Sequence, residues 1–314
     1  MSFIHKLLTL SPYPELMARR IYYSFLRGKM PQHIESGVKV SGDNIIKKDS
    51  DKLLRHLKKM GISKGDLLIV HSSVDALKTF NCNESQFIDH LIELVGETGT
   101  IAFPAFPEES LLKEENGLKI FDTKRSVAWT GMLPNLLLRK KGAIRSPFPC
   151  NPLVAFGAQA EEMMVRNLET VYPHGKGSCW GFCAEKHAKV LFLGIPTFHS
   201  NTILHVVEDY QPEFWPEDWY IEQEYLVKNN DELIRVKTKV RDVKWSKYLA
   251  ERYTESKYLK LGYIKREDFE GIPISIINDS FTLVNEIMKM WDKNRFFYLP
   301  KRILNYDKQR KGLQ

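Results

Sequence analysis

The chain has 314 residues but few cysteines and no long apolar run. Its four cysteines, Cys82, Cys150, Cys179 and Cys183, are too sparse for a disulfide framework. Cys179 and Cys183 also lack the second pair of ligands that a zinc site needs. No apolar segment reaches the roughly 20 residues of a membrane-spanning helix. These absences predict a cytoplasmic protein with reduced thiols, no metal and no integral membrane span.

Nucleotide-binding signatures are also missing. The sequence contains no GxGxxG fingerprint and no Walker P-loop, so a dinucleotide-dependent or NTP-hydrolysing activity has no support. The net charge of +7 suits a polyanionic ligand such as a nucleotide or coenzyme A. The lysines and arginines are spread along the chain, and no nucleic-acid-binding motif is present. We therefore expect a small phosphorylated ligand and no nucleic acid.

Helical and strand-like segments alternate along the first two thirds of the chain. Short apolar runs are typical of buried strands, and the amphipathic segments between them carry helix-capping residues and terminal glycines. This alternation predicts an α/β fold with a largely parallel central sheet. The prediction rests on a helix at 49–60 ended by Gly61, a helix after Asn83, and strands at 66–70, 100–103, 153–156 and 189–194.

Polar alternating segments replace the apolar runs towards the C-terminus. Two of them flank an Asn-Asn-Asp turn at 229–231, which predicts an antiparallel hairpin. We place this hairpin and a following helix as an insertion at 216–262, within a domain that spans 50–300. A basic segment at 1–49 precedes the domain, and we expect it to pack there as a helix rather than to lie on a membrane surface. A frayed basic tail is expected at 301–314.

The segment after the last of these strands carries the strongest signal for chemistry. Ser200 is a good N-cap for a helix on which Asn201, His205 and Glu208 would share one face, at i, i+4 and i+7. His199 would lie just outside the N-terminus of that helix. In α/β sheets ligands bind beyond the carboxyl ends of the strands. The segment therefore predicts a site built on imidazole and carboxylate groups.

Five segments in sequential order resemble the aminoglycoside 3-N-acetyltransferase family, over roughly residues 50–295. They are GDLLIVHSS from Gly65, LVGETGTIAFPAF from Leu94, the stretch from Phe121 to Gly157, HGKGS from His174, and KVLFLGIPTFHSNTILHVVED from Lys189. The resemblance implies a three-layer α/β/α fold, to which the hairpin region is added. It also implies acetyl-CoA as co-substrate and transfer of the acetyl group to an amino group on a sugar.

The chain departs from the antibiotic-modifying members of this family at two places. The family's second histidine, generally assigned as catalytic, falls on Asn151, and an acidic position before the last helix is occupied by His199. The form of these segments resembles a branch of surface-polysaccharide and O-antigen biosynthesis. We therefore expect a nucleotide-linked amino sugar as acceptor, for example a dTDP-3-amino-3,6-dideoxyhexose. The alternatives are an aminoglycoside 3-N-acetyltransferase conferring antibiotic resistance and a non-catalytic CoA-binding scaffold. Family analogy favours a homodimer.

His199 is the leading candidate for the base that takes the proton of the attacking amine, because an imidazole has a suitable pKa. Glu208 or Glu213 would orient it. His205 is the alternative base, and Asn151 would hold either an imidazole or the sugar. We expect direct attack on acetyl-CoA rather than an acetylated cysteine at Cys150, which has no activating neighbour in sequence.

The remaining candidates follow from matches to family positions and from residue chemistry. For the donor, the family's loop beside the pantetheine and pyrophosphate matches His71, Ser72 and Ser73, and two further positions that line that site match Phe106 and Trp129. For the substrate, we single out His174 in the glycine-rich loop, and Trp215 and Trp219 as rings that could stack on a sugar or base. The alternative for these aromatic residues is packing in the core.

Overall fold

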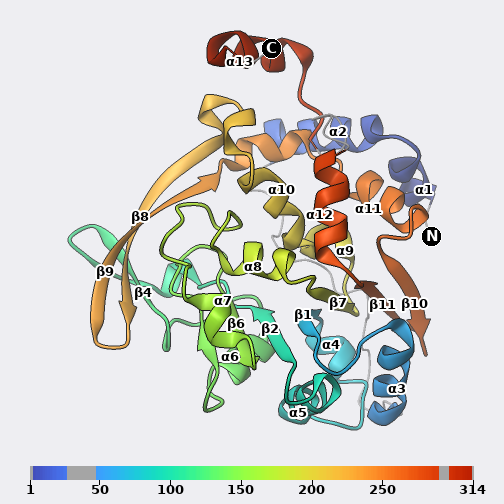
Figure 1. Cartoon of the computed structure of the whole chain (residues 1–314). Coiled ribbons are helices and arrows are strands. Elements are labelled where there is room, and N and C mark those ends of the chain that lie inside the picture. Colours follow the sequence, from blue (N-terminus) through green and yellow to red (C-terminus); the bar gives the residue numbers. More distant parts are fainter. Residues whose placement is uncertain (1–2, 27–46, 290–296, 313–314) are drawn as a thin grey trace.

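The computed structural model of the protein describes residues 3–26, 47–289 and 297–312. Its centre is a seven-stranded sheet with the strand order β10-β11-β7-β1-β2-β6-β5. Helices lie on both sides of this sheet (Figure 1). The strands are β1 (Leu67–Ser72), β2 (Thr100–Pro104), β5 (Ile144–Arg145), β6 (Leu153–Gly157), β7 (Lys189–Leu193), β10 (Lys265–Phe269) and β11 (Ile272–Ile277).

The three central strands, β7, β1 and β2, run parallel. On their two sides β11 pairs antiparallel with β7, and β6 pairs antiparallel with β2. The α/β class predicted from the sequence is confirmed, with the parallel ladder at the middle of the sheet. Because β6 runs against β2, the residues just before β6 lie at the same edge of the sheet as the residues just after β2. That edge holds the cleft described below.

The two faces of the sheet carry separate cores, as expected for a three-layer fold. On β1, Leu68 and Val70 face the layer of α3 (Ser50–Met60), α5 (Glu84–Val95) and α6 (Met132–Leu137). Leu67 and Ile69, which alternate with them, face the layer that includes α7 (Ala160–Met164), α8 (Cys179–Glu185) and α12 (Ser280–Lys289). Three shorter helices are α4 (Val74–Leu77), α9 (Thr197–Ser200) and α10 (Val206–Asp209).

Capping residues and a terminal glycine in the sequence predicted the bounds of α3 and α5 correctly. The Asp49 carboxylate accepts hydrogen bonds from the first turn of α3, and Gly61 ends that helix with φ of 116°, a conformation that favours glycine. Asn83 and Gln86 form a reciprocal capping box at the start of α5. These helix boundaries are confirmed.

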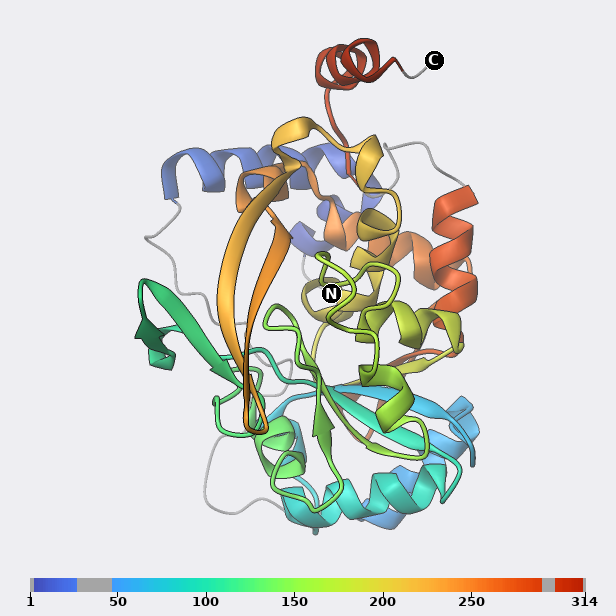
Figure 2. The same ribbon diagram turned by 60° about the vertical axis from the view of Figure 1, so that its left-hand side comes forward.

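The predicted hairpin is also confirmed and belongs to a second sheet. β8 (Tyr220–Asn229) and β9 (Glu232–Arg241) pair antiparallel around a turn in which Asn230 has φ of 55°. β3 (Lys113–Glu115) and β4 (Leu118–Asp122) complete the sheet in the order β3-β4-β8-β9. The hairpin runs as a long curved ribbon along one side of the molecule (Figure 2).

The N-terminal residues form α1 (Phe3–Leu10) and α2 (Pro12–Ile21), which pack against α11 (Glu251–Lys260). Glu15 is buried, and its carboxylate accepts hydrogen bonds from the backbone N–H groups of Arg252 and Tyr253 in the first turn of α11. A carboxylate at this position stabilises the helix N-terminus. The packing agrees with the expectation of a helix on the domain, whereas residues 27–46 of the predicted basic segment lie outside the described residues.

The C-terminal part differs from its expectation. Lys301–Lys311 forms the helix α13 rather than a frayed tail, and this helix lies at one end of the molecule (Figure 1). Its residues Ile303 and Leu304 pack against the core that contains Trp245. The segment contains no glycine or proline before position 312 and is rich in Lys and Arg, which favour helix. Within the described part of the chain, no helix is both long and apolar enough to cross a membrane.

Candidate active site

A cleft of about 480 Å³ opens at the edge of the large sheet where β2 ends and β6 begins. Its wall is formed by the loop after β2, the turn before β6, a loop before α8, the helix α10, and the hairpin β8–β9. Among the lining side chains, the titratable ones are Glu109, Cys150, His174, His205, Glu208, Asp209 and Arg241.

The first feature of the cleft is a buried pair of His174 and Asp209. Oδ2 of Asp209 accepts hydrogen bonds from Nδ1 of His174 at 2.9 Å and from the backbone N–H of His174 at 3.0 Å. Oδ1 of Asp209 accepts a third from the Tyr220 hydroxyl at 2.9 Å. His174 and Asp209 expose 5% and 6% of their surfaces. The carboxylate therefore fixes the ring of His174 from one side and directs Nε2 away from itself.

Asn151 lies on the other side of this ring. Its Nδ2 is 3.1 Å from Nε2 of His174, and its backbone carbonyl accepts a hydrogen bond of 2.7 Å from the indole N–H of Trp180. Asn151 has φ of 52°, a left-handed conformation that asparagine tolerates better than most residues. The turn before β6 is thus held in a conformation that presents the Asn151 amide to His174.

Glycines explain how the loop that carries His174 reaches its place. Gly181 in α8 lies so close to the loop that a Cβ atom there would overlap the carbonyl oxygen of Gly175. The Ser178 hydroxyl caps α8 by accepting a hydrogen bond from Gly181 N–H at 2.9 Å. On its other side the loop is joined to the hairpin, because the backbone N–H of Lys239 donates to the Val171 carbonyl at 2.7 Å.

The second feature is a pair of His205 and Glu208. Nδ1 of His205 is hydrogen-bonded to Oε1 of Glu208, and Nη1 of Arg241 donates to the same oxygen at 3.1 Å. Glu208 exposes 1% of its surface. Burial alone would raise the pKa of Glu208, but the charges of Arg241 and His205 outweigh this effect and hold the pKa below its ordinary value. Glu208 is therefore ionised at neutral pH.

The helix predicted after Ser200 is broken into pieces, and this corrects two expectations. Ser200 is the last residue of α9 rather than an N-cap, because the helix starts one turn earlier, after Pro196. Asn201 leaves the helical conformation, with φ of −82° and ψ of 66°, and the 3₁₀ turn Thr202–His205 separates it from α10. Asn201 therefore does not share a helical face with His205 and Glu208, which meet through the shorter i, i+3 spacing.

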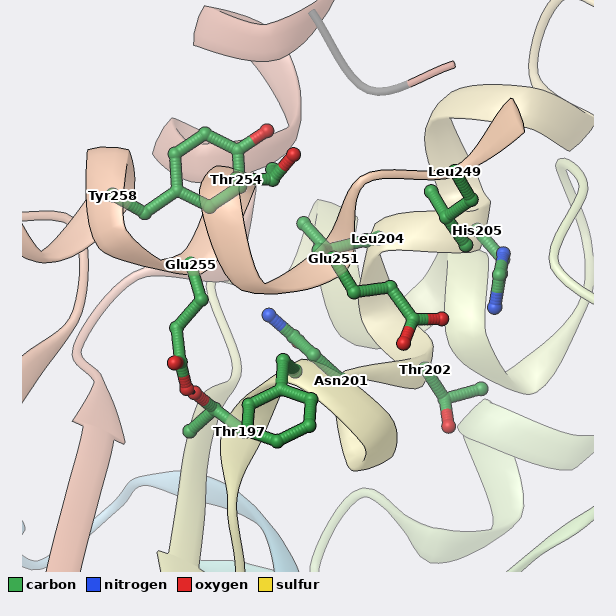
Figure 3. A pocket seen from close by; sticks show the side chains of 11 residues that line it. Thr197, Asn201, Thr202, Leu204, His205, Leu249, Glu251, Thr254, Glu255 and Tyr258 are labelled. Carbon is green, nitrogen blue, oxygen red and sulfur yellow. The ribbon is translucent and has the colours of Figure 1, made fainter. Parts of the chain in front are cut away.

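A smaller cavity of about 60 Å³ lies between α9 and α11, with His205 at the boundary between it and the cleft. Figure 3 shows Glu255 and Thr197 directed toward one another across this cavity. Glu255 also pairs with Arg266, and Glu251 pairs with Arg19. Both carboxylates are therefore already neutralised by arginines of the protein.

Cys150 lines the cleft but is not activated. Burial raises the pKa of its thiol to about 11, and its Sγ lies 3.5 Å from Oγ1 of Thr238. A thiol with such a pKa is almost entirely protonated at neutral pH, whereas the thiolate is the nucleophilic form. In the part of the chain that the structure describes, no three His, Cys, Asp or Glu side chains are grouped so that they could hold a metal ion.

The family model described as aminoglycoside 3-N-acetyltransferase matches residues 69–282, which is more than half of the chain. The chain belongs to the aminoglycoside 3-N-acetyltransferase family. The matched region includes the cleft residues from both imidazole–carboxylate pairs.

Curated relatives in this family share about 30% of their residues with the chain. Aminoglycoside N(3)-acetyltransferase III of Acinetobacter baumannii is 32% identical over 165 residues, which cover 48% of this chain and 57% of the relative. Aminoglycoside N(3)-acetyltransferase IX of Micromonospora chalcea is 28% identical over 171 residues, which cover 50% of this chain and 60% of the relative. The chain thus spans little more than half the length of the curated relatives it matches.

Solved structures of aminoglycoside acetyltransferases share the fold. AAC-IIIb in binary complex with CoASH has a TM-score of 0.65 at 23% identity, covering 81% of this chain and 99% of that structure. AAC-VIa bound to sisomicin has a TM-score of 0.66 at 19% identity, covering 79% and 99%. At these identities the comparison establishes a common fold.

These findings correct the expected acceptor. The sequence was interpreted in favour of a nucleotide-linked amino sugar of surface-polysaccharide or O-antigen biosynthesis, and that interpretation is wrong. The curated relatives that match are aminoglycoside N(3)-acetyltransferases, as in the alternative that the sequence also offered. The two departures at Asn151 and His199 were over-weighted relative to the similarity of the rest of the matched region.

The structure brings together only some of the predicted site residues. His174, His205, Glu208 and Asn151 all line the cleft, together with Phe106 and Trp129, whose rings are 6.1 Å apart. The backbone of His199 lies in α9, but its side chain is outside what the structure describes, so its assignment as the base stays a prediction.

The predicted donor loop is less open than expected. The ring of His71 is buried and stacked on Phe192, and burial lowers its pKa to about 3. The Ser73 hydroxyl caps α4, and its backbone N–H donates to Leu193 in the sheet. Ser72 is partly exposed at the end of β1. Contact between this loop and the donor therefore stays a prediction, with Ser72 as its most accessible side chain.

Trp215 and Trp219 are core residues, which corrects their assignment to substrate stacking. They expose 2% and 0% of their surfaces and stack on each other with ring centroids 4.3 Å apart. Phe297 packs edge-on against both rings. The Trp215 indole N–H donates to the Glu208 carbonyl at 3.0 Å and so supports α10 from beneath the cleft.

Sequence reasoning missed three charged residues of the cleft: Asp209, Arg241 and Glu109. Asp209 follows Glu208 directly in the sequence. Two adjacent carboxylates on a helix point in different directions, so this acidic pair could have indicated that each carboxylate has a partner of its own. Arg241 and Glu109 had no such signal, since both come from segments brought to the cleft by the second sheet.

Proposed function

We propose that this protein transfers an acetyl group from acetyl-CoA to the 3-amino group of an aminoglycoside. The observation that carries the proposal is the cleft, in which two imidazole–carboxylate pairs face one space within a chain of this family. The names of the curated relatives, which specify N(3) transfer, support the position of acetylation.

The chemistry requires a neutral amine, a group that takes its proton, and a stabilised oxyanion. The amine nitrogen attacks the thioester carbonyl carbon while an imidazole of the cleft accepts the N–H proton. The tetrahedral intermediate then collapses, the C–S bond breaks, and the thiolate of CoA receives a proton from the imidazolium. Each imidazole in the cleft has a carboxylate partner that stabilises the transient positive charge.

The lining of the cleft suits a polycationic acceptor, although the whole chain carries a net charge of +7. Glu109, Glu208 and Asp209 all contribute carboxylates to it, against the single guanidinium of Arg241. The Glu109 carboxylate is held at the wall by the Tyr225 hydroxyl at 2.9 Å and is also paired with Lys119, so Asp209 carries the least compensated charge of the three. Trp129, which is 56% exposed, adds an aromatic face on which a sugar ring can pack.

Acetyl-CoA is proposed as the donor because a protein of the same fold, AAC-IIIb, is solved in complex with CoASH. The donor would approach from the edge of the large sheet, where β1 and β2 end near Ser72 and Phe106. Phe106 lies between Trp129 and Trp180, which places an apolar surface there for the pantetheine arm.

The test is thiol release from acetyl-CoA with sisomicin, gentamicin or apramycin as acceptor, with the product position assigned by NMR. Streptomycin is the matched control, since guanidinium groups replace the amines on its cyclitol ring. We expect turnover with at least one of the first three drugs, acetylation at N3, and none with streptomycin. Turnover of none of the drugs, with acetyl-CoA still bound in a calorimetric titration, would refute the proposed function.

A further inference from the structure

The N-terminal helices pack on the domain with one face, and their opposite face is apolar. Glu15 and Leu16 of α2 are buried, and α2 contacts α11 and the 3₁₀ helix Val243–Tyr248. The π-helical turn Tyr22–Leu26 continues α2. Side chains four residues apart lie on one face of a helix. The outward face of this continuous helix carries Tyr13, Met17, Ile21 and Phe25, which expose 74%, 66%, 47% and 74% of their surfaces.

The outward side of a surface helix normally carries polar side chains, so an apolar outward face indicates an interaction site. We propose that this face and the basic helix α13 dock the protein on the surface of a bilayer that contains anionic lipids. The four side chains Tyr13, Met17, Ile21 and Phe25 are called the docking face below. The inference goes beyond the proposed acetyl transfer and does not depend on it.

The charges on these helices have one sign. The sequence of α13 has five Lys or Arg residues and one Asp, and Lys301 and Arg302 are exposed. On α2, Arg20 is exposed, whereas Glu15, the only acidic residue of the segment 3–26, is buried and paired with Arg19. The described side chains that reach solvent on α2 and at the start of α13 are therefore positive or neutral.

The 3₁₀ helix Val243–Tyr248 connects α2 with α13. Trp245 and Ile303 of α13 line one groove, and Ile303 packs against the core that contains Trp245. On the other side of this 3₁₀ helix, the Arg20 guanidinium of α2 lies over the ring of Tyr248, 5.5 Å from its centroid. Figures 1 and 2 show α2 and α13 at the same end of the molecule. The docking face and the positive charge of α13 therefore belong to one end of the protein.

Charge favours a membrane over a second copy of the chain as the occupant of the docking face. A two-fold dimer built on this end would bring the same surface of both copies together, so the basic groups of α2 and α13 would repel their counterparts. A bilayer with anionic lipids has the opposite charge and attracts Lys and Arg near its surface. Its headgroup region also accepts apolar and aromatic side chains such as those of the docking face.

The first test is co-sedimentation with vesicles of phosphatidylcholine, prepared with and without phosphatidylglycerol. We expect the wild type to bind the vesicles with phosphatidylglycerol and to bind phosphatidylcholine alone much more weakly. Met17→Ser/Phe25→Ser should lower the affinity at least about tenfold, because two apolar side chains no longer enter the bilayer. The matched control is Leu111→Ser/Val165→Ser, which removes apolar side chains that are 66% and 74% exposed elsewhere and should bind like the wild type.

A second pair of variants tests the position of the charge. Lys301→Gln/Arg302→Gln should weaken binding by about fivefold for each charge removed at low ionic strength. Arg235→Gln/Lys237→Gln removes the same two charges from β9, where the side chains are 64% and 75% exposed, and should bind nearly like the wild type. Added salt should weaken the binding of the wild type, because it screens the attraction to the lipid headgroups.

The inference is overturned if the wild type does not sediment with the phosphatidylglycerol vesicles, or if Met17→Ser/Phe25→Ser binds them as tightly as the wild type. Light scattering and urea denaturation identify the other occupants. A dimer that Met17→Ser/Phe25→Ser dissociates would assign the docking face to a second copy. A monomer that this variant destabilises in urea, and that binds no vesicles, would assign it to packing within the chain. None of these measurements uses acetyl transfer, so the result is independent of the proposed function.

Discussion

Replacing Arg241 by methionine tests whether the guanidinium charge beside Glu208 keeps this carboxylate of the cleft ionised. Glu208 has 2% of its side chain exposed, and Arg241 has 21%. Removing one partner of a buried ion pair typically costs about 3–5 kcal/mol, because the remaining charge is left uncompensated. Arg241 is partly hydrated and His205 stays beside Glu208. We therefore expect Arg241→Met to lower the free energy of unfolding by about 2–3 kcal/mol.

The assay is urea denaturation followed by tryptophan fluorescence, with Arg235→Met as the matched control. Arg235 lies on the same strand and pairs with Glu224, but its side chain is 64% exposed. Exposed pairs contribute little, so Arg235→Met should unfold at nearly the wild-type urea concentration.

The pH dependence of Arg241→Met has a definite sign. In the wild type the pKa of Glu208 is below its ordinary value of 4.5, so the stabilisation is complete above that pH and is lost as the pH falls through the lower, folded-state pKa. In the variant, burial without the guanidinium raises the pKa of Glu208, so the carboxyl group becomes neutral earlier. The difference in free energy of unfolding between variant and wild type should therefore become smaller as the pH falls from 7 to 5. A loss of unfolding free energy no larger than that of Arg235→Met, or a loss that increases on acidification, would refute this reasoning.

Three further substitutions test other parts of the site. Asp209→Asn places an amide N–H beside Nδ1 of His174 and moves the ring proton to Nε2, so kcat should fall by about 10²- to 10⁴-fold at an unchanged Kd for acetyl-CoA; a smaller change in steady-state assays would show that the reaction does not depend on this pair. Trp219→Ala should cost about 3–5 kcal/mol of unfolding free energy in urea, because the ring is fully buried; a raised KM at normal stability would instead restore a substrate role. Cys150→Ala should keep kcat within about threefold in the thiol-release assay, since a pKa of about 11 leaves little thiolate; a 100-fold loss would indicate an acetylated cysteine.

The elements that the sequence predicted well are those fixed by local contacts. The capping box at Asn83, the carboxylate cap at Asp49 and the glycine at position 61 each act within one turn of helix. The hairpin turn at 229–231 is equally local. Such features depend on residues that are neighbours in the chain, so their pattern is visible before any tertiary structure is known.

The break at Asn201 shows where such local reasoning ends. A Ser followed by an apolar periodic segment is a good helix start, and the prediction of one continuous helix followed from it. In the structure the chain begins α9 at Thr197 and must turn again before α10, because Thr197 is hydrogen-bonded to Glu255 while Glu208 is paired with Arg241. These partners are 58 and 33 residues away. Distant contacts outweigh the helix propensity of the segment.

The contact between His174 and Asp209 was equally out of reach of sequence analysis, and it bears on how Asn151 should be interpreted. His174 and Asp209 are 35 residues apart, and their contact depends on the loop that packs between α8 and the hairpin. From the sequence, an asparagine where the family's catalytic histidine is generally found raised the alternative of a scaffold without activity. The structure places the imidazole of His174 against that asparagine, from a different segment and with its own carboxylate. The change at Asn151 therefore does not remove the imidazoles from this cleft, and both His174 and His205 have to be tested before the chain is taken for inactive.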